Sequence, residues 1–390
     1  MFEHELQQAL SERRQQHRYR QRLLVSSPQT ARLDIDNQSL VNFASNDYLG
    51  LANHPDVIAA MQTAAAEVGV GSGASHLVCG HSYYHHQLEQ ALATFTGRPR
   101  ALLFSTGYMA NMGVVSALVG RGDKVFEDRL NHASLIDAGL LCRAQFTRFR
   151  HNDREQLNTL LKASTSGRKL IVVDGVFSMD GDTAPLDSYA RLCADHQAVL
   201  MVDDAHGFGI LGEQGGGCAQ HFGLSTQDLP ILVGTLGKAF GTFGAFVAGS
   251  EALIETLIQF ARTYIYTTAL PPSVAAASLV SLDLLQHDHH RRERLRQRIQ
   301  QFRLGAGRLN LRLMESSTPI QALVLGNDSL VLQVATRLKQ QGILVGAIRP
   351  PTVPEGSARL RITFSAAHTT EDVDRLLTAL DVAIPLEQRA

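Results

Sequence analysis

Between residues 100 and 249 the sequence alternates short apolar runs with segments of helical periodicity, and this order strongly constrains the fold. The runs are rich in Val, Ile and Leu without strict alternation, as expected of strands buried on both faces. The order predicts an α/β domain with a mainly parallel sheet. The predicted strands are RALLFS (100–105), KVFED (124–128), KLIVVDG (169–175), AVLMVDD (198–204), ILVGTLG (231–237) and GAFVAG (244–249). The predicted helices are 107–119, 132–141, 153–164 and 186–196.

The two ends of the chain have a different character. A polar, amphipathic pattern predicts a helix over residues 3–24, and Ser26, Ser27 and Pro28 follow it as a linker. A long helical stretch is expected over 273–304, followed by a small α+β layer. Its predicted elements are strands 320–325, 343–347 and 358–364 and helices 328–341 and 371–383. We therefore predict an N-terminal helix and arm (1–44), a large α/β domain (45–272) and a linking helix with a small C-terminal α+β domain (273–390).

Charge and cysteine content exclude several classes of function. Lys plus Arg number 36 and Asp plus Glu number 37, so no general electrostatic attraction to nucleic acid or anionic membranes is expected. No run of 18 apolar residues predicts a membrane span. The four cysteines lack zinc-site spacing, and we interpret them as incidental thiols in a reducing compartment. The N-terminus lacks an apolar secretory segment, so a cytoplasmic enzyme is expected.

The most informative window is ILVGTLGKAFGTFGAF, where a buried strand runs into Lys238 among glycines. Burial disfavours the ammonium form of a lysine, and a lysine tuned in this way forms Schiff bases with carbonyl carbons. The glycines leave room for a flat cofactor. A surface-loop lysine beside a glycine-rich turn is the alternative. The spacing is not that of a phosphate-binding P-loop.

Other polar residues also follow predicted strands. Asp203 ends the VLMVDD strand and precedes His206, where it could pair with a protonated pyridine nitrogen or act as a structural cap. Gly107 and Tyr108 begin a helix whose backbone N–H groups could bind phosphate. His132 is either a cap or an aromatic plate over a cofactor, and Ser178 follows the KLIVVDG strand. Together, these groups are what pyridoxal phosphate requires.

Two further motifs carry less weight. GVGSGA (69–74) fits a dinucleotide fingerprint, but it follows a helical pattern instead of a strand, which argues against nicotinamide binding. HDHH (287–290) could suggest a metal site, but it lies in a charged helical stretch without a clear third ligand. A solvated helix face is the preferred interpretation of that segment.

With these residues in place, the chain resembles the α-oxoamine synthases, a family of pyridoxal-phosphate enzymes, over nearly its whole length. The lysine window TLGKAFGTFG (235–244) is similar to the signature of class-II aminotransferase-like enzymes. The other similar segments are SNDYLGL (45–51), GSGASH (71–76), DRLNHASL (128–135), HND (151–153), GVFSMDGD (175–182), VDDAHG (202–207) and LRITFSAAHT (360–369). The resemblance implies the fold-type-I architecture of pyridoxal-phosphate transferases and a homodimer with active sites at the subunit interface.

The resemblance also implies residue roles. Lys238 would hold the cofactor as an internal aldimine and act as general base, Asp203 would pair with the pyridine nitrogen, and His132 would stack on the ring. Ser178 and His206 would contact the ring oxygen. Gly107, Tyr108 and Thr235 would hold the cofactor end, with Thr267 and Thr268 reaching the phosphate from the partner subunit. Asn46 and Arg361 resemble ligands of the amino-acid carboxylate, and Arg20, Arg349 and Thr352 resemble acyl-substrate contacts.

IRPPTVPEGSARLRIT (348–363) is most similar to the biotin-pathway member of the family. That similarity implies a decarboxylative condensation of L-alanine with pimeloyl-CoA or a pimeloyl carrier protein, releasing CO2 and the thiol. Relatives that use glycine with acetyl-CoA or succinyl-CoA, or serine with a long acyl-CoA, are the alternatives. A non-catalytic regulatory protein on the same scaffold is a further one. The stretch 215–230 is longer than the family pattern and is expected to be a loop without catalytic residues.

Overall fold

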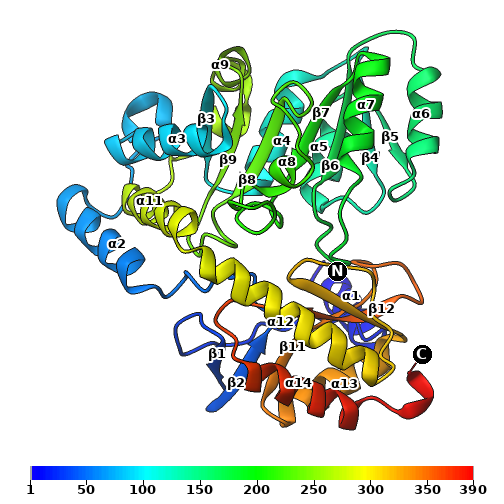
Figure 1. Cartoon of the computed structure of the whole chain (residues 1–390). Coiled ribbons are helices and arrows are strands. Elements are labelled where there is room, and N and C mark those ends of the chain that lie inside the picture. Colours follow the sequence, from blue (N-terminus) through cyan, green and yellow to red (C-terminus); the bar gives the residue numbers. More distant parts are fainter. Residues whose placement is uncertain (1, 390) are drawn as a thin grey trace. The chain divides into compact units, whose positions relative to one another are not determined.

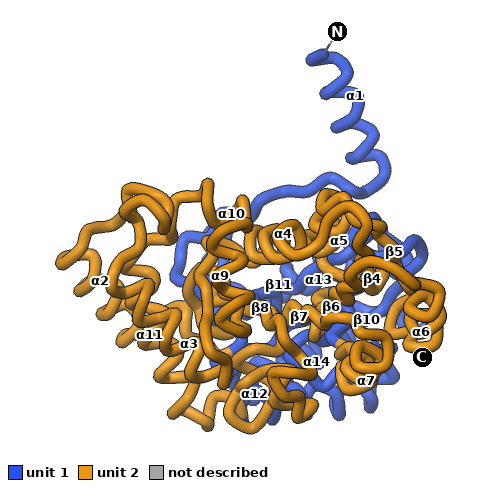
Figure 2. Tube along the Cα trace, turned by 90° about the horizontal axis from the view of Figure 1, so that it is seen from above, with its two compact units in different colours: residues 1–48, 179–181, 293–390 blue, residues 49–178, 182–292 orange. Residues whose placement is uncertain are grey.

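The computed structural model describes residues 2–389, and the chain divides into two compact units (Figures 1 and 2). Unit 1 comprises residues 1–48, 179–181 and 293–390, and unit 2 comprises residues 49–178 and 182–292. The contact-defined divisions at 48/49 and 292/293 differ from the boundaries expected from the sequence at 44/45 and 272/273. The boundaries at 44/45 and 272/273 remain predictions.

Unit 2 is built on a seven-stranded sheet of order β3-β9-β8-β7-β6-β4-β5. Neighbouring strands from β8 through β5 are parallel, and β9 is antiparallel to both β3 and β8. All six strands predicted in this region are present, and one additional strand was missed, β5. The bounds are β3 (Arg100–Phe104), β4 (Lys124–Asp128), β5 (Gln145–Phe149), β6 (Lys169–Asp174), β7 (Val199–Asp203), β8 (Ile231–Thr235) and β9 (Ala245–Gly249).

Helices cover both faces of this sheet (Figure 1). Their bounds are α2 (Pro55–Val68), α3 (Tyr83–Thr96), α4 (Gly107–Leu118), α5 (Ala133–Leu141), α6 (Arg154–Lys162), α7 (Leu186–His196), α8 (Gly217–His221), α9 (Glu251–Phe260), α10 (Arg262–Ile265) and α11 (Pro272–His287), with the π-helix η1 at His76–Gly80. The predicted helices 107–119, 132–141, 153–164 and 186–196 correspond to α4 through α7.

The core of unit 2 explains why its strands lack an alternating pattern. Val172, Met201 and Val233, on three neighbouring strands, pack in one apolar cluster with α4, α5 and α9. The next residues along β6 and β7, Val173 and Val202, point to the opposite face and are also fully buried. Because both faces are covered, the interior positions of these strands are apolar on both faces, as in other parallel sheets.

Unit 1 contains a five-stranded sheet of order β1-β2-β11-β12-β10. The N-terminal strand β2 pairs in parallel with the C-terminal strand β11, so residues more than 300 positions apart share one sheet. The bounds are β1 (Arg32–Ile35), β2 (Gln38–Phe43), β10 (Ile320–Gly326), β11 (Ile343–Ile348), β12 (Ala358–Thr363), α13 (Asp328–Gln340), α14 (Thr370–Ala383) and the 3-10 helix η2 (Leu386–Gln388). The C-terminal elements match the predicted α+β layer, whereas β1 and β2 were not predicted.

Two helix predictions need correction. Helix α1 spans Phe2–Gln15 and so ends well before residue 24. None of its residues is buried, so no packing extends it, and the left-handed backbone of His17 (φ 56°) follows it. The predicted helix 273–304 is two helices, α11 and α12 (His289–Arg308), separated at Asp288. The Arg292 guanidinium donates to the Leu285 carbonyl at 2.6 Å and satisfies part of the end of α11.

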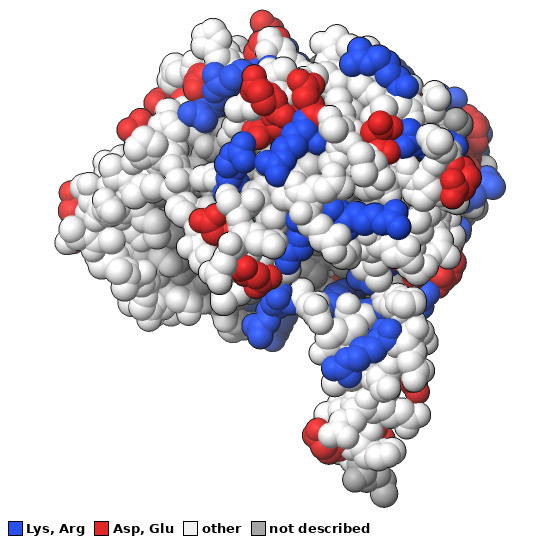
Figure 3. Space-filling model, turned by 90° about the horizontal axis from the view of Figure 1, so that it is seen from below, with Lys and Arg blue, Asp and Glu red and all other residues white. Residues whose placement is uncertain are grey.

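The surface agrees with the balanced charge of the sequence. Figure 3 shows Lys and Arg side chains interspersed with Asp and Glu side chains on the face drawn, with no large region of one sign. Within residues 2–389, no helix combines the length and the hydropathy that a membrane span requires. All four cysteines are free thiols, and only Cys79 is exposed.

Candidate active site

A cavity of about 180 Å³ lies in unit 2 where the central parallel strands end. Asp174, Asp203 and Thr235 are the last residues of β6, β7 and β8, and Asp174 is paired in register with Asp203. The carboxyl ends of parallel strands are the usual ligand-binding edge of open α/β sheets. The lining residues are Gly107, Tyr108, His132, Ser134, Asp174, Ser178, Asp203, Ala205, His206, Thr235 and Lys238.

Lys238 reaches this cavity from the glycine-rich segment that follows β8. Its Nζ lies 2.7 Å from Nε2 of the buried His206. The segment packs tightly: Gly241 has a φ of +68°, and a Cβ there would lie 2.3 Å from the backbone nitrogen of Ala52. Only glycine fits this turn without strain. Lys238 is half-buried and lines the cavity, so the surface-loop alternative does not describe it.

Asp203 is held by donors from two elements. Asn111, buried inside α4, donates from Nδ2 to Asp203 Oδ2 at 2.6 Å, and the backbone N–H of Ala205 donates to Oδ1 at 3.0 Å. The carboxylate itself is 6% exposed. Because a buried charge needs hydrogen-bond donors, these two contacts allow Asp203 to remain an anion facing the cavity.

His132 stands beside this carboxylate as the residue that caps α5. Its Nδ1 is 2.7 Å from Ser134 Oγ, which in turn accepts from Asn111 at 2.9 Å. Its backbone N–H donates to Asp174 at 2.6 Å. Burial and the Lys238 charge lower the pKa of His132 against the opposing field of Asp203. The imidazole is therefore neutral near pH 7. His132 caps α5, and this position leaves it able to play the predicted role of an aromatic plate over a cofactor as well.

The pKa of Asp174 is shifted upward, whereas that of His132 is shifted downward. Burial and the neighbouring Asp203 carboxylate raise the pKa of Asp174 well above its ordinary range, although the His132 N–H opposes this. Two carboxyl groups at adjacent strand ends disfavour a second negative charge and favour a cation between them. The site is therefore suited to a positively charged ring or amine.

The N-terminus of α4 is another part of the cavity lining. Thr106 caps this helix, and its Oγ1 accepts from Met109 N at 3.1 Å. The first-turn N–H groups of Gly107 and Tyr108 have no intrahelical partners and can bind an anion. Thr235 Oγ1 donates to Gly244 O at 3.1 Å on the lysine segment. This part of the cavity is chemically suited to a phosphate group.

The structure brings eight of the predicted residues around the one cavity: Gly107, Tyr108, His132, Ser178, Asp203, His206, Thr235 and Lys238. Thr267 and Thr268 do not line it. Thr268 accepts a hydrogen bond from Ser105 Oγ at 3.2 Å and forms a bridge with Ser75. Their predicted role toward a partner subunit stays a prediction, as do the roles of the eight.

Sequence reasoning missed four residues of this site: Asn111, Ser134, Asp174 and Ala205. Asn111 carried one usable signal, since it is a lone amide in an otherwise apolar stretch of α4. Asp174 lay within the predicted strand KLIVVDG and Ser134 within DRLNHASL. Neither had been given a role.

The five predicted substrate residues all belong to unit 1. Arg361 is buried in β12, and its Nη2 donates to Asn46 Oδ1 at 3.1 Å. Arg349 is half-buried and donates to the backbone carbonyl of His17. Arg20 and Thr352 are exposed. The structure thus joins Arg361 and Asn46 into one hydrogen-bonded pair, and their substrate roles stay predictions.

The stretch 215–230 is not simply a loop, as had been expected. It contains α8, whose Cys218 N–H donates to Asp204 Oδ2 at 2.7 Å. Burial raises the pKa of Asp204 to about 7. Since Asp204 directly follows Asp203, this contact ties the stretch to the end of β7 that lines the cavity.

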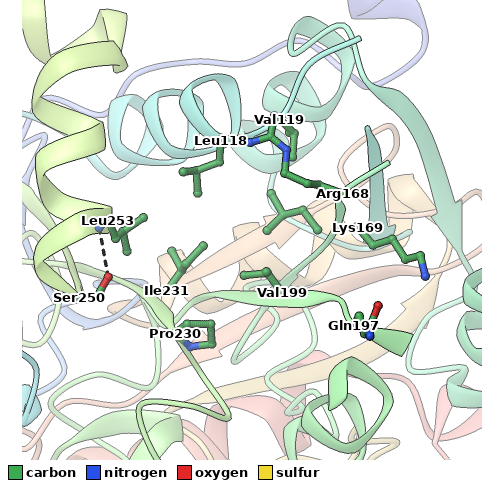
Figure 4. Close-up of a pocket in the computed structure, with 11 residues that line it drawn as sticks. Leu118, Val119, Arg168, Lys169, Gln197, Val199, Pro230, Ile231, Ser250 and Leu253 are labelled. Atoms are coloured by element: carbon green, nitrogen blue, oxygen red, sulfur yellow. Dashed lines mark hydrogen bonds between the residues drawn. The ribbon is translucent and has the colours of Figure 1, made fainter. Parts of the chain in front are cut away.

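A second cavity of about 280 Å³ lies at the opposite edge of the same sheet (Figure 4). Its lining includes Lys169, Val199 and Ile231, the first residues of β6, β7 and β8. Lys169 donates to the His196 carbonyl at 2.8 Å, and Arg168 pairs with Asp123 at 2.8 Å. The two charged side chains that line this mostly apolar cavity are thus bound to the His196 carbonyl and to Asp123. The titratable groups with candidate roles line the first cavity.

A charged clamp holds the loop that carries Ser178. His151 Nδ1 is 3.1 Å from Asp128 Oδ1, and His151 Nε2 is 2.8 Å from Asp182 Oδ2. Burial alone would lower the pKa of His151, but the hydrogen bonds and charges of the two aspartates outweigh it and raise the pKa to about 9. The clamp ties the end of β4 to the segment after Ser178.

The residues around the first cavity fit the pyridoxal phosphate expected from the sequence. A carboxylate, a neutral imidazole, a primary amine and a helix N-terminus are the groups that a pyridinium ring, its face, its aldehyde and its phosphate need. All four are supplied by unit 2 around one cavity. The donor set therefore fits this cofactor.

Comparison with known proteins supports the same conclusion. The family model for aminotransferase class I and II matches residues 38–380. The chain is 63% identical to 8-amino-7-oxononanoate synthase from Saccharophagus degradans over 97% of this chain and 96% of the relative. It resembles a serine palmitoyltransferase variant from S. paucimobilis with a bound PLP–myriocin aldimine (TM-score 0.90, 34% identity, covering 93% and 92% of the chains). It also resembles 8-amino-7-oxononanoate synthase from Francisella tularensis (TM-score 0.78, 34% identity, covering 88% and 97%).

The His151 clamp predicts a pH-dependent stability. A histidine whose pKa is raised on folding stabilises the protein fully below its unfolded-state pKa of 6.5, and this contribution is lost as pH rises through about 9. We expect His151→Gln to lower the urea midpoint most at about pH 6, with the difference from wild type shrinking toward about pH 10. The exposed His221→Gln is the matched control. A His151→Gln deficit that stays constant with pH would contradict the charged clamp.

Proposed function

The chain belongs to the aminotransferase class I and II family, and we propose that it has 8-amino-7-oxononanoate synthase activity with pyridoxal phosphate as cofactor. The reaction condenses L-alanine with a pimeloyl thioester and releases CO2 and the thiol, a step of biotin biosynthesis. The observation that carries this proposal is the cavity that Lys238, His206 and Asp203 line together. The identity of 60–63% to curated relatives with that name supports the choice of reaction.

The residues that would hold the cofactor are those of the first cavity. Lys238 would bind its aldehyde carbon, Asp203 its ring nitrogen and His132 its ring face. Ser178 and His206 would contact the ring oxygen, and the N-terminus of α4 with Thr235 would bind the phosphate end. When bound, pyridoxal phosphate supplies a ring that accepts electron density from the Cα of an attached amino acid.

Asp203 determines the electronic character of this site. Its carboxylate is fixed by Asn111 and the Ala205 N–H, so it stays in place to keep a facing ring nitrogen protonated. Burial and the Asp203 charge raise the pKa of Asp174. The pair therefore resists a second negative charge.

Lys238 then acts as the general base. A primary amine positioned in the cavity removes the Cα proton of L-alanine, and His206, 2.7 Å from Nζ, orients this amine. Closely positioned acid–base groups of this kind contribute about 10²–10⁴-fold to rate. The same Nζ can return the proton at the end of the reaction.

Substrate anions are assigned to unit 1. We propose that the Arg361 guanidinium, already oriented by Asn46 Oδ1, binds the L-alanine carboxylate. Arg20, Arg349 and Thr352 are proposed contacts of the acyl substrate. These roles follow the family resemblance and the polar chemistry of each side chain.

The activity is tested by thiol release from pimeloyl-CoA by the cofactor-loaded protein. We expect release with L-alanine and little with glycine or L-serine. Lys238→Ala should reduce release by at least about 100-fold because the general base is lost. Lys169→Ala, in the second cavity, is the matched control and should retain activity.

Release that does not require L-alanine, or full turnover by Lys238→Ala, would contradict the proposal. Preference for glycine would instead assign the chain to a relative that uses acetyl-CoA or succinyl-CoA.

We also propose that the chain forms a homodimer. Large apolar side chains of unit 2 are unusually exposed, with Val70 at 79% and Tyr266 at 71%. Exposed apolar surface of this kind is typical of subunit contacts. Sedimentation equilibrium should give twice the chain mass of 42.5 kDa. A monomer mass at micromolar concentration would contradict the dimer.

A further inference from the structure

Four histidines gather in one short segment of unit 2, away from the lining of the cofactor cavity. His76 begins η1, His81 directly follows it, and His85 and His86 lie in the first turn of α3. The Nδ1 atoms of His76 and His81 are 2.9 Å apart. We propose that these two Nδ1 atoms bind one divalent transition-metal ion of the Ni²⁺ or Cu²⁺ type, with water in the remaining positions.

The separation of the two nitrogen atoms favours this class of ion. Two metal–nitrogen bonds of about 2.05 Å that meet at 90° place their nitrogens about 2.9 Å apart, whereas a tetrahedral angle places them about 3.3 Å apart. Right angles between ligands belong to square-planar and octahedral coordination, which Cu²⁺ and Ni²⁺ prefer over the tetrahedral geometry of Zn²⁺. The distance between the two nitrogen atoms therefore matches the former ions.

Both ligand rings are fixed by neighbours. The His76 ring stacks on Tyr264 with 5.0 Å between ring centroids and 11° between planes. His81 Nε2 lies 3.9 Å from Glu89 Oε2, and Glu89 Oε1 accepts from the Leu103 N–H at 2.9 Å. Histidines that bind metals commonly direct their second nitrogen toward a carboxylate, which orients the ring.

His85 supports the pair without joining it. Its Nδ1 accepts from the Ser82 N–H at 2.9 Å, and its Nε2 is 2.6 Å from the Leu270 carbonyl. Both of its nitrogens are therefore engaged, and the ring is fully buried. It fills the space behind His76 and His81, which leaves these two as the available ligands.

The contact between the two rings sets what metal binding has to change. Neutral imidazole is the form that binds metal. Without the ion, the 2.9 Å contact is an N–H···N hydrogen bond. Binding requires that this ring proton move to the second nitrogen of the same ring and that the rings turn until both Nδ1 lone pairs meet at the ion, and no proton has to leave the site.

Isothermal titration of the untagged, cofactor-loaded protein with NiCl₂ tests the site. We expect one equivalent of Ni²⁺ to bind, and to bind more tightly than Zn²⁺. His81→Ala and His76→Phe should each weaken the affinity at least tenfold. The phenylalanine retains a ring against Tyr264, so loss of Ni²⁺ binding in that variant cannot be attributed to lost stacking. Ni²⁺ should raise the unfolding temperature of wild type and not of these variants.

Two controls separate this site from other histidines. His86→Ala removes the alternative group of His81, His86 and Glu89, and the double variant His287→Ala/His290→Ala removes the histidine-rich segment between α11 and α12. Both should retain the wild-type Ni²⁺ affinity. Absence of binding at millimolar Ni²⁺, unchanged affinity in His76→Phe, or loss of binding in His86→Ala would each overturn the assignment.

Discussion

The site depends on a buried carboxylate at the end of a buried strand. Asp203 ends β7 between two parallel neighbours, where a negative charge without donors would cost several kcal/mol. Asn111 of α4 and the Ala205 N–H supply those donors. Because Asn111 also donates to Ser134 beside His132, the same amide links α4, the Asp203 carboxylate and the residue that caps α5. One hydrogen-bonded network thus holds the three groups for which cofactor roles are proposed.

Several buried acids near the ends of these strands resist a second negative charge. Burial raises the pKa of Asp174, and it raises that of Asp204 to about 7 and of Glu127 to about 8. These groups resist a further negative charge, while the Asp203 carboxylate is stabilised by its donors. A protonated ring nitrogen and a lysine amine are the partners such an environment favours, and Lys238 lies in the same cavity.

The sequence predicts those features of the fold and the site that depend on neighbouring residues. The central strands are visible as apolar runs, and Lys238, Asp203 and Gly107 were predictable because each occupies or follows a strand end. Asn111 and Asp174 were not, since a local pattern does not show which group a helix amide or a strand carboxyl will meet. The pairing of β2 with β11 joins segments about 300 residues apart and leaves no local signal. The ends of α1 and α11 depended on packing and on Arg292, which periodicity does not report.

In the proposed reaction, Asp203 makes proton removal from the amino acid possible. Deuterium incorporation at Cα of L-alanine in D₂O, followed by NMR with the cofactor-loaded protein and no acyl thioester, measures this step alone. We expect exchange by wild type and a rate at least about 100-fold lower for the isosteric Asp203→Asn. Exchange by Asp203→Asn at the wild-type rate would contradict it.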